Sequence, residues 1–156
     1  MNNERRQILK GAGTAAMVAV AASAGLLKPG AVFAADWNKA AFETKDMAAA
    51  ITALDASGAA ESDQIVLDAP TIAENGTRVP IKVTSNIPNT EHIILLAEKN
   101  GTPLLADFDL MNGTEGYVET MVKLGGTGNV RAIVKAGGKV YTASKEVKVT
   151  IGGCGG

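Results

Sequence analysis

The most constraining feature of this 156-residue chain is a change in the spacing of its apolar residues near Gln64. Beyond that point, short runs alternate between apolar and polar residues, a period typical of half-buried β-strands. A chain patterned in this way buries one side of each strand, so it predicts sheets packed face to face. The apolar positions of three such runs are Val79, Ile81 and Val83; Val118, Val122 and Leu124; and Val130, Ala132 and Val134.

Turn motifs separate these runs. Asn-Gly-Thr occurs at Asn75, Asn100 and Asn112, and a Gly-Gly pair begins at Gly137. Such pairs adopt the positive φ angles that tight hairpins require, so we expect turns at all four sites. We also expect the glycine-rich segment 124–130 to be a hairpin loop. Together these signals predict a mainly β fold, an antiparallel β-sandwich of about seven strands over residues 64–151.

A helical pattern precedes the strands. Apolar residues recur at helical spacing from residue 37 to 54, and Gly58 with its polar neighbours ends the run. The sequence therefore predicts one N-terminal helix within residues 36–58. Its apolar positions are Trp37, Ala40, Ala41, Met47, Ala48, Ile51 and Leu54.

Two stretches depart from simple alternation. Residues 92–97 are apolar on both sides, so the second side needs cover, either from the N-terminal helix or from another subunit. In the last strand Val140 occupies an even position, whereas Val147, Val149 and Ile151 are odd. This change of phase predicts a bulge or a break near Ser144.

Residues 1–35 have the features of a removable export signal. Arg5 and Arg6 precede an uncharged stretch over residues 11–27, and small residues lead to cleavage after Ala34 or Ala35. A membrane anchor is the competing interpretation, but this stretch is shorter than the roughly 20 residues that a spanning helix needs.

The adjacent arginines indicate a twin-arginine signal, which exports folded proteins. Glu4 stands where Ser or Thr is usual, so a general secretory signal stays open. Cleavage removes four of the 15 basic and one of the 16 acidic residues, which leaves a net charge of −4. We therefore expect a periplasmic protein, and the charge argues against nucleic acid or an anionic membrane as its partner.

The sole cysteine, Cys154, lies between two glycine pairs at the C-terminus: Gly152 and Gly153, then Gly155 and Gly156. One cysteine cannot form an internal disulfide, and an exposed thiol is prone to dead-end oxidation. Glycines lack Cβ and adopt most backbone angles. We interpret residues 152–156 as a thin, flexible arm that carries Cys154 about 10 Å beyond the last strand.

Nothing near Cys154 in the sequence would activate its thiol, because no cation or helix start is close and the chain-end carboxylate follows. Little thiolate would form at neutral pH until a partner supplies activation, which fits a carrier better than an active site. His92 has neither a cysteine nor a carboxylate at ligand spacing, and the glycines of segment 124–130 lack the lysine of a phosphate-binding loop. The sequence therefore predicts no metal site and no catalytic residue.

Three segments together resemble the SoxY family, the sulfur-carrying subunits of bacterial thiosulfate oxidation. They are DAPTIAENGTRVPIKV from Asp68, PNTEHIILLAEKN from Pro88, and YTASKEVKVTIGGCGG from Tyr141, which ends in the specific GGCGG motif. The resemblance covers essentially the whole chain after the signal. It implies an immunoglobulin-like sandwich, with Cys154 as the covalent attachment site for sulfur intermediates.

The resemblance also implies partners. A SoxZ-like β subunit would form a heterodimer or heterotetramer with this chain and would cover the second side of residues 92–97. A c-type cytochrome would join thiosulfate to Cys154 as an S-thiosulfonate, and a manganese hydrolase would release sulfate to leave a persulfide. A molybdenum–haem sulfane dehydrogenase would oxidise the remaining sulfur before a second hydrolysis. The metals and haems belong to those enzymes, so the chain itself would bind no cofactor and catalyse no reaction.

Two rival functions stay open on the residues. A ubiquitin-like sulfur carrier also ends in Gly-Gly, but its sulfur is carried on the terminal carboxylate, and here Cys154 interrupts the glycines. The main alternative is an exported scaffold or adhesion sandwich whose Cys154 forms an intermolecular disulfide.

Overall fold

A computed structural model describes residues 38–111 and 113–151. The predicted signal, residues 1–35, and the predicted arm, residues 152–156, lie outside the described residues. The described elements are α2 (Lys39–Glu43), α3 (Met47–Ala53), β1 (Ala60–Glu61), β2 (Ile65–Asp68), β3 (Ile72–Asn75), β4 (Val79–Ser85), β5 (Thr90–Ala97), β6 (Leu104–Asp109), β7 (Tyr117–Val122), β8 (Gly128–Ala136) and β9 (Lys139–Ile151).

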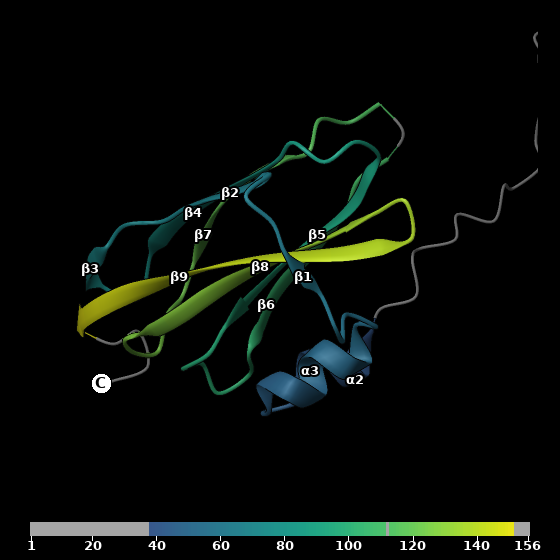
Figure 1. Ribbon diagram of the computed structural model, residues 1–156. Helices are drawn as coiled ribbons and strands as arrows, with labels where there is room; N and C mark the ends of the chain where they lie inside the picture. Colours follow the sequence, from purple (N-terminus) through teal and green to yellow (C-terminus); the bar gives the residue numbers. More distant parts are fainter. Residues whose placement is uncertain (1–37, 112, 152–156) are drawn as a thin grey trace, which may run out of the picture. The chain divides into compact units, whose positions relative to one another are not determined.

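The strands form two facing sheets, and the helices pack beside the larger one (Figure 1). The smaller sheet has the order β2-β4-β7, and the larger has the order β1-β9-β8-β5-β6, with β3 also paired to β9. The mainly β sandwich is therefore confirmed. Seven strands are linked by antiparallel pairs, as predicted, and the short strands β1 and β3 pair in parallel with β9.

The main core lies between the two sheets, and the alternating runs supply it as predicted. In β4 every second residue is buried, starting at Val79, and β7 buries Val118 and Val122. From the larger sheet, β5 and β8 contribute Ile93 and Leu95, and Val130, Ala132 and Val134, to the same cluster.

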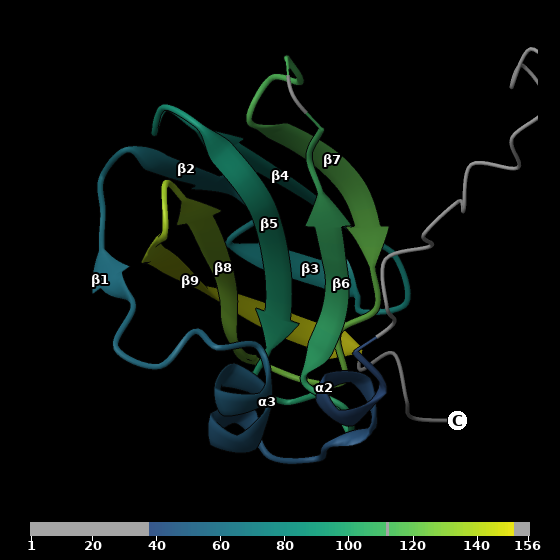
Figure 2. The ribbon, with the colours of Figure 1, turned by 90° about the vertical axis from the view of Figure 1, so that its right-hand side faces the viewer.

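A second core lies on the other side of the larger sheet, beneath the helices. Ile94 and Leu96 of β5 are fully buried there against Leu54. Figure 2 shows α3 and α2 beside the ends of β5 and β6. The sequence left two sources of cover open, the N-terminal helix and another subunit. The structure shows that the helical segment provides the cover. The expectation that a partner subunit covers Ile94 and Leu96 is wrong.

The predicted single N-terminal helix is instead two short helices. Thr44 is extended, with φ −68° and ψ 145°, and the Asp46 carboxylate accepts a hydrogen bond from the Ala49 N–H at 2.7 Å, which starts α3 afresh. Asn38 caps α2 and donates from its amide to the Ala53 carbonyl at 2.7 Å, which ties the two helices together. Neither of these helices is long and apolar enough to span a membrane, nor is any other helix in the described part of the chain.

The predicted bulge near Ser144 is absent from the pairing of β9 with β8. The register runs unbroken from Gly128↔Val147 to Ala136↔Lys139. The apparent change of phase has another cause, because both sides of β9 meet apolar cores. Val140 packs into the core beneath the helices, whereas Tyr141 and Val149 pack against the core between the sheets.

The turn predictions have mixed outcomes. Gly137 and Gly138, at φ +55° and +71°, close the predicted β8–β9 hairpin, and Asn100 lies in the β5–β6 hairpin loop. Asn75 does not form a hairpin, since the chain crosses there from β3 into the smaller sheet. Its side chain instead accepts a hydrogen bond from the Thr77 N–H at 2.8 Å.

Two other connections also cross between the sheets. The segment containing Asn112 joins β6 to β7, and Asn112 itself lies outside the described residues. The glycine-rich segment 124–130 leads from β7 into β8. The expectation that this segment is a hairpin loop is therefore wrong.

The core beneath the helices should contribute strongly to stability. Ile94→Ala leaves a cavity at a fully buried site, so we expect the free energy of unfolding to fall by about 2–5 kcal/mol in chemical denaturation. Ile72→Ala is the matched control, because Ile72 is 58% exposed and its truncation should change stability by about 0.5 kcal/mol or less. Equal effects of the two variants would contradict this assignment of the core.

Candidate functional site

The predicted arm follows β9, so the end of β9 defines the candidate site. The pairing of β9 with β8 stops at Gly128↔Val147, and β9 continues to Ile151. Residues 148–151 therefore extend past the neighbouring strand. Ile151 is 64% exposed, so the strand ends at the surface.

One edge of this extension is held by β3 (Figure 1). The parallel register places Ile72 opposite Lys148, Ala73 opposite Val149 and Asn75 opposite Ile151. The Thr150 hydroxyl adds a shared hydrogen bond to two carbonyls of the same strand, those of Ala73 at 3.2 Å and Glu74 at 3.0 Å. β3 thus supports the strand up to its last described residue.

The other edge is held by the side chain of Thr127, the residue that precedes β8. Its hydroxyl accepts a hydrogen bond from the Val149 N–H at 2.9 Å and donates to the Val149 carbonyl at 3.4 Å. These are the two bonds that a neighbouring strand would make to one residue. A single side chain therefore continues the sheet edge beyond the point where β8 begins.

Loops from three parts of the chain meet at this end of β9. The Gly76 N–H donates to the Ile151 carbonyl at 2.8 Å, and the Gly76 carbonyl accepts from the Leu124 N–H at 2.7 Å. Asn100 braces the same loop, since its amide donates to the Lys123 carbonyl and its oxygen accepts from the Gly125 N–H, both at 2.8 Å. The end of β9 is therefore enclosed by backbone and side-chain hydrogen bonds.

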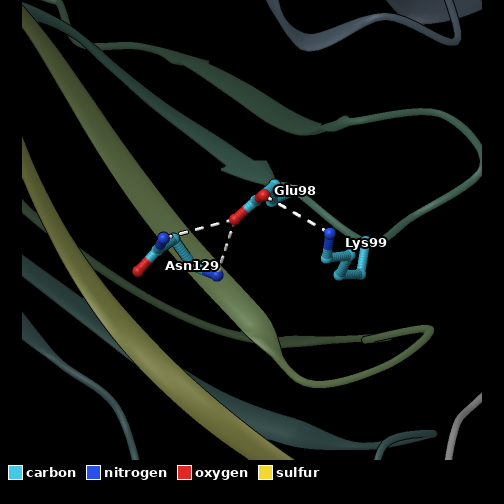
Figure 3. A network of polar contacts seen from close by, with 3 residues as sticks. All are labelled: Glu98, Lys99 and Asn129. Atoms are coloured by element: carbon cyan, nitrogen blue, oxygen red, sulfur yellow. Dashed lines mark hydrogen bonds and ion pairs between the residues drawn. The ribbon is translucent and has the colours of Figure 1, made fainter.

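A polar network of Glu98, Lys99 and Asn129 fixes the start of β8 (Figure 3). The Glu98 carboxylate accepts hydrogen bonds from the backbone N–H of Asn129 at 3.3 Å and from its side-chain amide at 3.2 Å. Lys99 approaches the other Glu98 oxygen at 3.5 Å. The Asn129 backbone bond is the main reason that the pKa of Glu98 is lowered, and the charge of Lys99 adds to it.

His92, the sole histidine, lies towards the opposite end of β5 from Glu98. Its Nδ1 is 3.5 Å from an Asp107 oxygen on β6, so a carboxylate that is distant in sequence accompanies it. In the described residues no group of three or more His, Cys, Asp or Glu side chains could hold a metal ion.

The predicted site residues, Cys154 and its flanking glycines Gly152, Gly153, Gly155 and Gly156, lie outside the described residues. The structure instead places around the end of β9 a set of residues that the sequence did not predict as part of a site: Gly76, Asn100, Thr127 and Thr150. Two of them belong to the Asn-Gly-Thr motifs, and Thr127 belongs to the glycine-rich segment. Only the topology of the fold shows that these motifs converge.

Comparison with known families decides the identity of the chain. Residues 51–154 match the family model of the sulfur oxidation protein SoxY. The chain belongs to the SoxY family. The matched region covers most of the chain and includes Cys154.

One solved structure agrees with this family match. This SoxY chain is similar to the sulfur carrier protein SoxY from Chlorobium limicola f thiosulfatophilum, with 40% sequence identity and a TM-score of 0.59. The alignment covers 65% of this chain and 94% of the Chlorobium chain. A superoxide reductase (neelaredoxin) from Ignicoccus hospitalis matches at 21% identity and a TM-score of 0.49, over 55% of this chain and 80% of its own. The comparison with curated proteins gives no match.

The Glu98 network should make a small, pH-dependent contribution to stability. Because the folded-state pKa of Glu98 lies below the ordinary value of 4.5, the contribution is present above that pH and is lost as the pH falls through the lowered pKa. We expect the melting temperature of wild type to approach that of Glu98→Gln in acid. Glu61→Gln, outside the network, should not reproduce this convergence. A constant gap between wild type and Glu98→Gln at all pH values would contradict the prediction.

Proposed function

We propose that this SoxY chain is a covalent carrier of sulfur intermediates on Cys154 during thiosulfate oxidation to sulfate. The main support is the combination of a family match that includes Cys154 with a strand that is held up to Ile151. The Chlorobium SoxY, 40% identical, is itself called a sulfur carrier protein.

The carrier cycle consists of four steps, all on intermediates that stay covalently attached to the Cys154 sulfur. The Cys154 thiolate and thiosulfate join by loss of two electrons to a cytochrome, which gives the S-thiosulfonate. Hydrolysis releases sulfate and a proton and leaves a persulfide. Oxidation of the outer sulfur with three waters gives an S-sulfonate and releases six electrons and seven protons. A second hydrolysis releases sulfate and restores the thiol.

The chain presents Cys154, and the partner enzymes catalyse the oxidation and hydrolysis steps. A glycine arm is thin enough to enter a narrow channel, and it reaches about 10 Å past Ile151. The thiol is activated only inside a partner. While the carrier is unbound, the thiol is not activated and is therefore protected from oxidation. In this proposal the chain is not an enzyme, and the metals and haems stay with the cytochrome, the manganese hydrolase and the sulfane dehydrogenase.

Assembly and location complete the proposal. A SoxZ-like β subunit pairs with this chain in a heterodimer or heterotetramer. Residues 1–35 direct the folded protein to the periplasm through a twin-arginine signal, which would allow a partner without a signal to be exported with it.

Cys154→Ser tests the attachment site. We expect the variant to fold with a wild-type melting temperature and to pair normally, while thiosulfate oxidation by the reconstituted system is abolished. Intact-mass measurement of wild type should show sulfur or thiosulfonate adducts on Cys154. If Cys154 carries no sulfur adduct and the protein forms a covalent dimer, the result would instead favour the scaffold whose tail forms an intermolecular disulfide.

Gly153→Val tests the need for a thin arm. A branched side chain next to Cys154 restricts the backbone and widens the segment that must enter the channel, so we expect slower turnover with unchanged stability. The rate of sulfate release under saturating partner enzymes measures this. An unchanged rate would show that the width of the arm does not limit the reaction.

A further inference from the structure

We propose that Thr127 and Thr150 are positioning residues that fix where the carrier arm begins. Their hydroxyls hold residues 148–151 in the sheet, so that only the residues after Ile151 are free to enter a partner. This inference rests on the proposed function, because it concerns the length of the arm that bears Cys154.

The end of β9 needs such support because β8 stops too early. Past Val147, the edge of β9 that faces β8 has no strand partner in the described residues, and a strand end held on one edge alone frays readily. Thr127 supplies both bonds to Val149 from a single hydroxyl, and Thr150 fastens the same segment to β3 on the other side. The two threonines thus act on opposite edges of one segment.

The loop that carries Thr127 is itself fixed. Leu124 is buried and bonded through its N–H to Gly76, which in turn bonds to Ile151. Asn100 holds the residues on either side of Leu124. The Thr127 hydroxyl is therefore held in place by the same residues that secure the strand end.

The consequence is a defined arm length. With the segment held, three residues lead from Ile151 to Cys154, a reach of about 10 Å. With residues 148–151 released, seven residues lead from Val147, a reach of about 24 Å. Effective concentration falls roughly as the −3/2 power of tether length, so release lowers the effective concentration of Cys154 at a docked active site about three- to fourfold.

Amide hydrogen exchange on the purified protein tests the clamp directly. We expect Thr127→Val to raise exchange at Val149 about two- to tenfold, as for one lost hydrogen bond, and the double variant with Thr150→Val to raise it across residues 148–151. Thr127→Ser keeps the hydroxyl and should restore wild-type exchange. Thr84→Val, on the smaller sheet, is the matched control and should leave these residues unchanged. Thr127 and Thr150 are exposed, so the variants at these two positions are expected to fold.

A nitroxide label on Cys154 tests the reach of the arm. In wild type, paramagnetic broadening of amide signals should stay close to the end of β9, and in the double variant it should extend to more distant strands. Turnover with the partner enzymes should fall about three- to fourfold in the double variant and recover with serine at both positions. Unchanged exchange and unchanged broadening in the double variant would overturn the proposal.

The outcomes separate this inference from the proposed function. If wild-type Cys154 never carries sulfur, the carrier function fails, whereas exchange and broadening still report whether the two hydroxyls fix the start of the tail. If sulfur is carried and turnover is unaffected by a demonstrably frayed strand, the carrier stands and the positioning role is refuted.

Discussion

The centre of the larger sheet, at β5 and β8, is buried on both faces, and the rest of the described structure depends on that double burial. Ile93 and Leu95 of β5 point to the smaller sheet, while Ile94 and Leu96 point to the helices. Consecutive residues of one strand therefore supply two separate cores, and β8 does the same with Val134 and Ile133. Helices of five and seven residues, too short to be stable alone, are stabilised by the same burial.

β9 extends this rigid centre to the surface. It pairs with β8 over nine residues, and then exchanges that partner for β3 and the Thr127 hydroxyl. In the function proposed for it, this SoxY chain needs both a stable body and a short, mobile arm. The strand β9 meets both needs. Its first part is fixed by the sheet, and its last part is fixed by side chains, so that the arm begins at a defined residue.

The sequence predicted the elements that depend on local pattern and failed where distant segments meet. The burial of Val79, Ile81 and Val83 follows from alternation alone. The prediction of a bulge near Ser144 was wrong, because the apolar residues of β9 face two different cores. In the sequence, this pattern looks the same as a slip in phase. The break at Thr44 was missed because alanine-rich runs read as continuous helix, although Asp46 is a favourable cap.

For the candidate site, the sequence predicted Cys154 and its glycines from composition, and these stay predictions. It could not predict Thr127, because a threonine between glycines carries no signal until the fold places it beside Val149. The parallel pairing of β3 with β9 was equally hidden, since its paired residues are 76 positions apart and β3 precedes an apparent hairpin turn. Both would have required knowledge of the order of strands in the sheet.

The parallel arrangement of β3 and β9 has a mechanical consequence. In the proposed function, a partner that draws the tail along the axis of β9 would load bonds that run across the strand, slanted as in any parallel pair. The load is then shared in shear by several contacts of residues 148–151, whereas a strand pulled sideways would peel away one contact at a time. The strand end would therefore resist tension that is applied along the axis of β9.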